Sequence, residues 1–159
     1  MPMKIDGLEN INTIFSVFHD GEINRCVKTN SHLEFDVHIQ YLAERINPAF
    51  KKFSVVLEGV EELHFTTWPD DANAKPDVLA DVGSIFTEEL EILSGEIKNG
   101  AIEVACNQPL PNLGYCGGFL NIKAKSAFVS DEAGKEYSIE ELCSLSTSYW
   151  NEWSNKNKA

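Results

Sequence analysis

Residues 32–40, HLEFDVHIQ, place four side chains that can bind a metal ion or transfer a proton at every second position: His32, Glu34, Asp36 and His38. Apolar residues alternate with them, which is the period of a β-strand with one buried and one exposed face. Because a strand rises about 3.3 Å per residue, His32 and His38 would lie roughly 20 Å apart and could not share one ion. Asp36 and His38, about 7 Å apart on one face, form the pair that could belong to a single site.

A third ligand would complete a catalytic zinc site, which takes three protein ligands and leaves a position for water. The best-placed donor is His64, which lies in an alternating run on the face opposite Leu63 and Phe65. If the strands of His38 and His64 were neighbours, the chain would be a small metal-dependent hydrolase. The solvated face of an antiparallel sheet shows the same alternation, and we favour that interpretation. We therefore predict no metal ligands and no cofactor.

Two other groups could do chemistry, His19–Asp20 and Cys116. A carboxylate beside an imidazole raises its basicity, but adjacent residues seldom face each other, so a role in ending a helix is favoured. Cys116 lies in the glycine-rich segment GYCGG, where a thiol would be accessible, but a reactive thiol needs a lowered pKa. The chain contains no Gly-x-Ser-x-Gly, phosphate-binding glycine loop or His-Glu-x-x-His. We predict no catalytic residues and favour a non-enzymatic function.

The formal net charge of −12 is concentrated in one region of the chain. Between Glu58 and Glu103 there are 12 acidic and 2 basic residues, a net charge of −10, whereas the rest holds 13 acidic and 11 basic residues, a net charge of −2. A regional negative field repels nucleic acid and anionic membranes and attracts cationic partners. Solubility alone would also explain it. We predict no nucleic-acid or membrane partner.

Trp68 stands beside the acidic segment Pro69-Asp70-Asp71, a combination that is typical of a protein-binding surface. Binding energy at interfaces concentrates in Trp, Tyr and Arg side chains. The alternative is that Trp68, Trp150 and Trp153 all fill the space between sheet and helix. We predict as partner-binding residues Glu61, Glu62, Trp68, Asp70, Asp71, Asp77 and Asp81.

The secondary structure that must position these side chains is predicted to be α+β. A 3-4-3 spacing of apolar residues predicts a helix over 6–18 with Asp6 as its N-cap, and a Ser138–Glu141 capping box predicts a C-terminal helix. Short connections indicate a curved, mostly antiparallel sheet, with a type I′ turn at Asn99-Gly100 and a bulge at Gly95. We predict about seven strands, at 22–29, 32–42, 53–60, 61–68, 90–98, 101–107 and 119–130.

Length and composition are typical of one domain over residues 1–159, with 43% apolar residues to form its core. No run approaches the ~20 apolar residues that cross a bilayer, and the first residues lack the layout of a signal peptide. The four cysteines include no Cys-x-x-Cys pair, so we predict free thiols. A cytoplasmic protein is expected.

The order of FHDGEI (18–23), LEFDVHI (33–39) and LHFTTW (63–68) resembles that of a group of small bacterial proteins. Some members of that group are thought to act as immunity proteins for polymorphic or contact-dependent toxins. The resemblance covers about the first 70 residues, and it implies a non-enzymatic protein that neutralises a basic toxin. An acidic inhibitor would suit such a partner, because toxin nucleases are usually cationic where they hold nucleic acid. A small-ligand-binding domain, with the sheet as a cup under the helices, is a further alternative.

Overall fold

The alternating apolar segments form one antiparallel sheet of eleven strands in the computed structural model, which describes residues 3–156. The strands are β1 (Ile5–Asp6), β2 (Glu22–Thr29), β3 (His32–His38), β4 (Lys52–Glu58), β5 (Glu62–Pro69), β6 (Val78–Leu79), β7 (Leu90–Lys98), β8 (Ala101–Asn107), β9 (Tyr115–Lys123), β10 (Ser126–Ser130) and β11 (Glu136–Tyr137). The helices are α1 (Leu8–Val17), α2 (Gln40–Ala43), α3 (Val82–Ile85), the 3₁₀ helix η1 (Pro111–Leu113) and α4 (Ile139–Lys156). The α+β class, the antiparallel sheet and the C-terminal helix are confirmed, whereas the prediction of about seven strands was too low.

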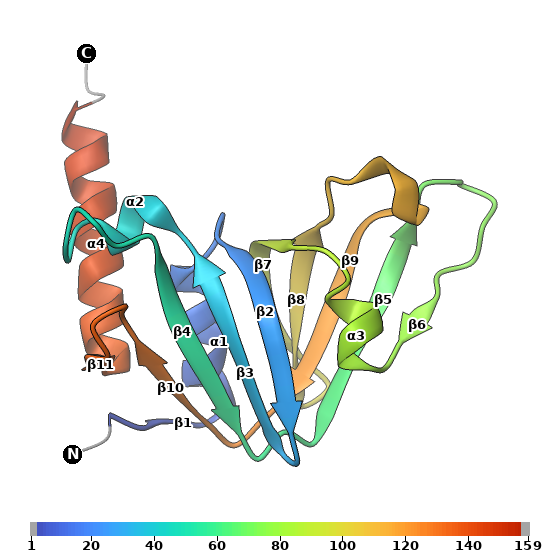
Figure 1. Cartoon of the computed structure of the whole chain (residues 1–159), viewed down its shortest axis with the longest axis horizontal. Coiled ribbons are helices and arrows are strands. Elements are labelled where there is room, and N and C mark those ends of the chain that lie inside the picture. Colours follow the sequence, from blue (N-terminus) through green and yellow to red (C-terminus); the bar gives the residue numbers. More distant parts are fainter. Residues whose placement is uncertain (1–2, 157–159) are drawn as a thin grey trace.

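The sheet has two halves, and among residues 3–156 the strand pairing that joins them is that of β2 with β7. Its strand order is β1-β10-β4-β3-β2-β7-β8-β9-β5-β6, and β11 pairs with β10. We call the strands from β1 to β2, with β11, the first half, and those from β7 to β6 the second half. The β2–β7 ladder consists of two residue pairs, Glu22 with Glu91 and Ile23 with Leu90. Figure 1 shows the two halves at an angle to each other.

Helix α1 lies behind β2 and β3, and α4 stands beside the first half (Figure 1). The buried face of α1 follows the predicted apolar spacing: the ring of Phe15 lies 6.3 Å from that of Phe35, and the ring of Phe18 lies 5.0 Å from that of Phe53. Because Phe35 and Phe53 are on neighbouring strands, α1 covers the inner face of the first half. The helix begins after Gly7, so the prediction of Asp6 as N-cap was wrong.

The capping box of α4 is confirmed. The Ser138 hydroxyl accepts a hydrogen bond from the Glu141 amide at 3.1 Å, and the Ser138 amide donates to the Glu141 carboxylate at 3.0 Å. The same carboxylate has a lowered pKa, chiefly because the Ser138 amide donates to it. This reciprocal pair satisfies two amides at the start of the helix.

Two predicted strands are each divided in the structure. The segment 32–42 forms β3 and then the short helix α2, because Ile39, Leu42 and Ala43 also satisfy a helical spacing and are buried. The segment 119–130 belongs to two strands, β9 and β10, which lie in different halves of the sheet. The chain leaves one half for the other at Ala124–Lys125, where the Lys125 amide donates to the Glu58 carbonyl.

Strands β4 and β5 are consecutive but not paired, contrary to the expectation that short connections join antiparallel neighbours. β4 pairs with β3 and β10, whereas β5 pairs with β9 and β6. Gly59, with a φ of 66°, turns the chain, and the amides of Val60 and Glu61 donate to carbonyls of Ser31 and Lys123. The turn therefore passes the chain from the first half to the second.

The β7–β8 hairpin has the predicted turn but not the predicted bulge. Asn99 and Gly100 both have positive φ, 53° and 77°, as a type I′ turn requires. The register shifts between Ile92 and Ser94 rather than at Gly95. Gly95 is needed for close packing instead, because a Cβ there would lie 2.6 Å from the Asn12 Oδ1 atom of α1.

Candidate functional site

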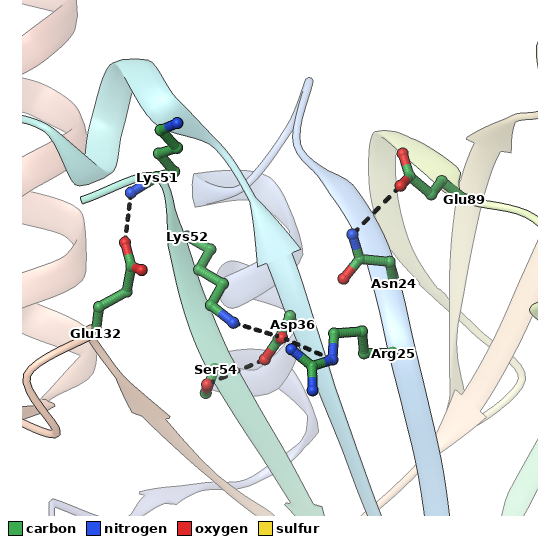
Figure 2. A network of polar contacts seen from close by, with 8 residues as sticks. All are labelled: Asn24, Arg25, Asp36, Lys51, Lys52, Ser54, Glu89 and Glu132. Atoms are coloured by element: carbon green, nitrogen blue, oxygen red, sulfur yellow. Dashed lines mark hydrogen bonds and ion pairs between the residues drawn. The ribbon is translucent and has the colours of Figure 1, made fainter. Parts of the chain in front are cut away.

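The outer face of β3 carries the row of polar residues that first suggested a metal site. Asp36 is largely buried, with 13% of its side chain exposed, and it contacts three neighbours (Figure 2). Lys52 donates to it at 2.9 Å, Ser54 donates at 3.1 Å, and Arg25 lies 4.0 Å away. His32, at the other end of the row, is 3.0 Å from Glu58. The side chain of Asp36 therefore joins three strands and already has its partners.

The structure does not bring Asp36, His38 and His64 together. His64 lies on β5, and β2, β7, β8 and β9 stand between β3 and β5 in the sheet. At about 4.8 Å per strand, five spacings separate β3 from β5 by roughly 24 Å along the sheet. Within residues 3–156, no group of three or more His, Cys, Asp or Glu is placed to hold a metal ion. The strand order therefore does not support the alternative of a metal site shared by these three residues.

Metal ions are accordingly expected to leave the stability of the protein unchanged. A folded-state site present at 100 times its Kd would add about 2.7 kcal/mol to the free energy of unfolding. We predict no rise in melting temperature with excess zinc, manganese or nickel, measured by differential scanning fluorimetry. A rise that His38→Ala abolishes would contradict this placement.

His19, Asp20 and Cys116 occupy structural positions. The His19 ring bonds the Ser16 carbonyl at 2.7 Å and stacks on Trp150 at 5.4 Å, which fixes the exit from α1. The His19 and Asp20 side chains approach to only 3.8 Å and both are exposed to solvent in part. The thiol of Cys116 donates to the Trp68 carbonyl, and all four cysteines are free thiols.

The predicted partner-binding residues lie in separate places along β5 and β6. Glu61 and Glu62 are at the start of β5, where Glu61 forms an ion pair with Lys123 at 3.5 Å. Asp70 and Asp71 follow the other end of β5, about 26 Å away along the strand. Asp81 caps α3 by accepting hydrogen bonds from Ser84, which lower the pKa of its carboxyl.

Trp68 lies on the outer face of β5, half-buried and close to the loop that carries Asp70, Asp71 and Asp77. Its ring meets that of Phe119 edge-on at 5.0 Å and lies over the backbone of Gly117, where a Cβ would come within 2.8 Å of it. Trp150 packs between His19 and Tyr41, whereas Trp153 is 50% exposed. The tryptophans therefore do not share one role in the core.

A group of carboxylates that sequence reasoning missed gathers at the β2–β7 contact. A hollow of about 390 Å³ there is lined by Glu22, Glu88, Glu89, Glu91, Asn107, Pro109 and Leu110. The spacing of Glu88, Glu89 and Glu91 was a visible signal, but Glu22 joins them only through the pairing of strands remote in sequence. A hydrogen bond with Glu89, together with burial and the neighbouring charges, raises the pKa of Glu22 to about 7.

One row of paired residues connects this hollow to the acidic loop after β5. Glu91 pairs with Asn107, Asn107 with Gly117, and Gly117 with Trp68. Three strand spacings, about 14 Å, thus separate Glu91 from Trp68. Beyond Trp68, the Asp70 amide donates to the Gly114 carbonyl, which holds the loop at the same edge. We call the carboxylates along this row and loop the acidic edge: Glu22, Glu88, Glu89, Glu91, Asp70, Asp71 and Asp77.

The acidic edge differs from the other acidic parts of the sheet in its ion pairs, although Lys75 stands in the same loop as Asp71 and Asp77. Elsewhere in the second half, Lys98 lies 3.2 Å from Glu103 and 3.8 Å from Glu96. In the part of the chain that the structure describes, no lysine or arginine forms an ion pair with the seven carboxylates of the acidic edge. Their negative charge is therefore available to a partner.

No helix within residues 3–156 is both long enough and apolar enough to pass through a bilayer. Comparison of the chain with protein-family models, with curated proteins and with solved structures found no match.

Proposed function

We propose that the protein is a non-enzymatic binding module that holds a basic partner protein at the acidic edge, in the manner of an immunity protein that neutralises a toxin. The observation that carries the proposal is the acidic edge itself: seven carboxylates around a hollow and an adjoining loop, none of which forms an ion pair with a lysine or arginine of residues 3–156. Carboxylates arranged in this way accept bidentate hydrogen bonds from arginine.

Several features of the acidic edge suit a protein partner. The hollow of about 390 Å³ is large enough for a lysine or arginine side chain, and Leu110, 45% exposed, adds an apolar contact at its rim. Trp68 supplies a half-buried aromatic ring at the far end of the same row. A concentrated negative field also steers a cationic partner towards the surface, and steered association can approach ~10⁸–10⁹ M⁻¹s⁻¹ at low salt.

We divide the predicted partner-binding residues by their positions in the fold. Asp70, Asp71, Asp77 and Trp68 are retained because they lie at the acidic edge. Glu61 and Glu62 lie at the opposite end of β5, so we assign them a contribution to the long-range field rather than to direct contact. Asp81 is engaged in capping α3 and contributes in the same indirect way.

The location of the proposed surface can be tested with hexa-arginine as a defined cationic probe. In a titration followed by ¹H–¹⁵N NMR at low salt, we expect the largest shift changes at the acidic edge, including Glu22, Glu89 and Asp70. The variant Asp70→Lys/Asp71→Lys/Asp77→Lys should weaken binding about tenfold or more, since like charges replace attractive ones. Reversal of Glu34, Glu44 and Glu140, three exposed carboxylates of the first half and its helices, provides the matched control. Equal weakening by both triple variants would contradict the proposal.

A further inference from the structure

The two halves of the sheet are joined by a short junction between β2 and β7. Although these strands have 8 and 9 residues, only two residue pairs connect them. Just before β2, the Asp20 amide donates to the Ile92 carbonyl at 2.7 Å, and the Ile92 amide donates to the Gly21 carbonyl at 2.8 Å. The backbone hydrogen bonds of the junction therefore involve residues 20–23 and 90–92.

Like charges face each other across this junction. Glu22 and Glu91 form one of its two residue pairs, so their side chains project from the same face. Opposed residues in an antiparallel pair have Cβ atoms about 4.5–5.5 Å apart, and like charges at that distance are destabilising. Because the ladder has only two pairs, this repulsion is offset mainly by the apolar packing of Ile23, Leu90 and Ile92 and by the contact of α1 with β7.

A proton can remove the repulsion. The carboxyl groups of Glu22 and Glu89 line the same hollow at the junction, and a single proton shared between them would replace their repulsion with a hydrogen bond. Asn24 of β2 also donates to Glu89, at 3.5 Å, and so reaches across the junction (Figure 2). Both bonds connect the first half to the segment that leads into the second.

The other polar groups around this pair supply little compensating positive charge. His38 of β3 pairs with Glu22, and its imidazolium form attracts Glu89. Lys52 of β4 lies beyond His38 but forms its ion pair with Asp36. The remaining neighbours are acidic or neutral. Glu88 and Glu91 line the hollow, Asn107 of β8 donates to Glu91, and Tyr115 of β9 lies near Glu88. The side chain of Asp20 is directed to His19.

We propose that the β2–β7 junction is a pH-dependent hinge, in which a proton held between the Glu22 and Glu89 carboxyl groups keeps the two halves of the sheet together and its loss loosens them. The protonated Glu22 donates to the Glu89 carboxylate while the junction is closed. When the proton leaves, three carboxylates remain at a two-pair ladder. The inference concerns the fold and does not depend on whether the acidic edge binds a partner.

The direction of the pH dependence follows from the two carboxyl groups. The pKa of Glu22 is raised to about 7, first by the hydrogen bond with Glu89, and the pKa of Glu89 is lowered by the same bond. Because an unperturbed glutamate titrates near ~4.3, the stabilisation from the Glu22 proton is complete below that pH and is lost as the pH rises through about 7. The lowered pKa of Glu89 has the opposite effect: its contribution to stability is lost as the pH falls, and this occurs at more acidic pH.

Amide hydrogen exchange measures this hinge directly. The protection factors of the Asp20 and Ile92 amides, corrected for intrinsic exchange, should fall about tenfold between pH ~6 and pH ~8.5 in the wild-type protein. Those of amides between β3 and β4 should stay constant. In Glu22→Gln the fall should disappear, because the amide NH₂ donates to the Glu89 carboxylate at every pH. The control variant Glu34→Gln changes a carboxylate on the same face of the neighbouring strand β3. In it the protection factors of the junction amides should fall with pH as they do in the wild type.

Either of two results of this experiment would contradict the hinge. The protection factors of the junction amides could be as constant with pH as those of the amides between β3 and β4. Alternatively, the loss of protection at high pH could persist in Glu22→Gln. If Glu22→Gln does not fold, Glu91→Gln replaces it, and removal of the facing charge should reduce the fall. An NMR titration of the side-chain carboxyl carbons, which needs no substitution, should show Glu22 titrating near neutral pH; a titration near pH ~4.3 would also exclude the hinge.

Discussion

Gly118→Ala is expected to lower the free energy of unfolding by about 3 kcal/mol, at the upper end of the usual cost of overpacking. Gly118 lies on β9 between β8 and β5, and it is buried. A Cβ there would overlap the Thr66 backbone carbonyl and come within 2.6 Å of the Phe65 ring. The carbonyl belongs to a paired strand and cannot move without breaking the ladder. Urea denaturation followed by circular dichroism measures the change.

Gly83→Ala is the matched control for that substitution. Gly83 lies in α3, and the nearest atom to its Cβ would be the Asp81 carboxylate at 3.4 Å, an ordinary contact. Alanine also favours a helix over glycine by about 1 kcal/mol. We therefore expect an unchanged or slightly higher stability. Equal destabilisation by the two variants would show that Gly118 has no special packing role.

Phe35→Ala is expected to cost about 3–5 kcal/mol, the usual range for removing a buried aromatic side chain. The residue is 2% exposed, and its ring stacks on Phe15 of α1 at 6.3 Å. Its loss would leave a cavity between the helix and the first half of the sheet. The transition in urea should move to lower concentration with little change in its slope.

Glu34→Ala, one residue away, provides the comparison for Phe35→Ala. Its side chain is exposed on the outer face, so we expect a change within about 0.5 kcal/mol. A loss of stability at Glu34 as large as that at Phe35 would contradict the assignment of the inner and outer faces of β3.

The elements with strong local patterns could be predicted from the sequence. The apolar alternation of 33–37 places Leu33, Phe35 and Val37 in the core, where all three are found. The same holds for the apolar stripe of α1, the capping box at Ser138 and the turn at Asn99-Gly100. In each case, the residues that decide the structure lie within a few positions of one another.

The arrangement of strands depends on contacts that no local pattern records. The short turn at Gly59 has the appearance of a hairpin, yet it passes the chain between the halves of the sheet. Likewise, nothing near Glu22 in the sequence indicates that it will face Glu91, 69 positions away, across the β2–β7 junction. The hollow at the junction and the separation of His38 from His64 therefore became visible only in the fold.

The fold distributes the acidic residues differently from their order in the sequence. Residues 61–81 look like one acidic surface in the sequence, but the length of β5 separates Glu61 and Glu62 from Asp70 and Asp71. The unpaired carboxylates of the second half combine with Glu22 of the first half instead. The hinge and the proposed binding surface consequently share Glu22, Glu89 and Glu91.

The central claim is that the acidic edge binds a basic protein, and affinity capture with matched variants tests it most directly. Native lysate would be passed over the immobilised wild-type protein, the Asp70→Lys/Asp71→Lys/Asp77→Lys variant and the variant with Glu34, Glu44 and Glu140 changed to lysine. We predict that the wild type and the first-half variant retain a protein of basic isoelectric point, that salt elutes it, and that the acidic-edge variant fails to retain it. Retention of no basic protein by the wild type, or equal retention by all three, would contradict the claim.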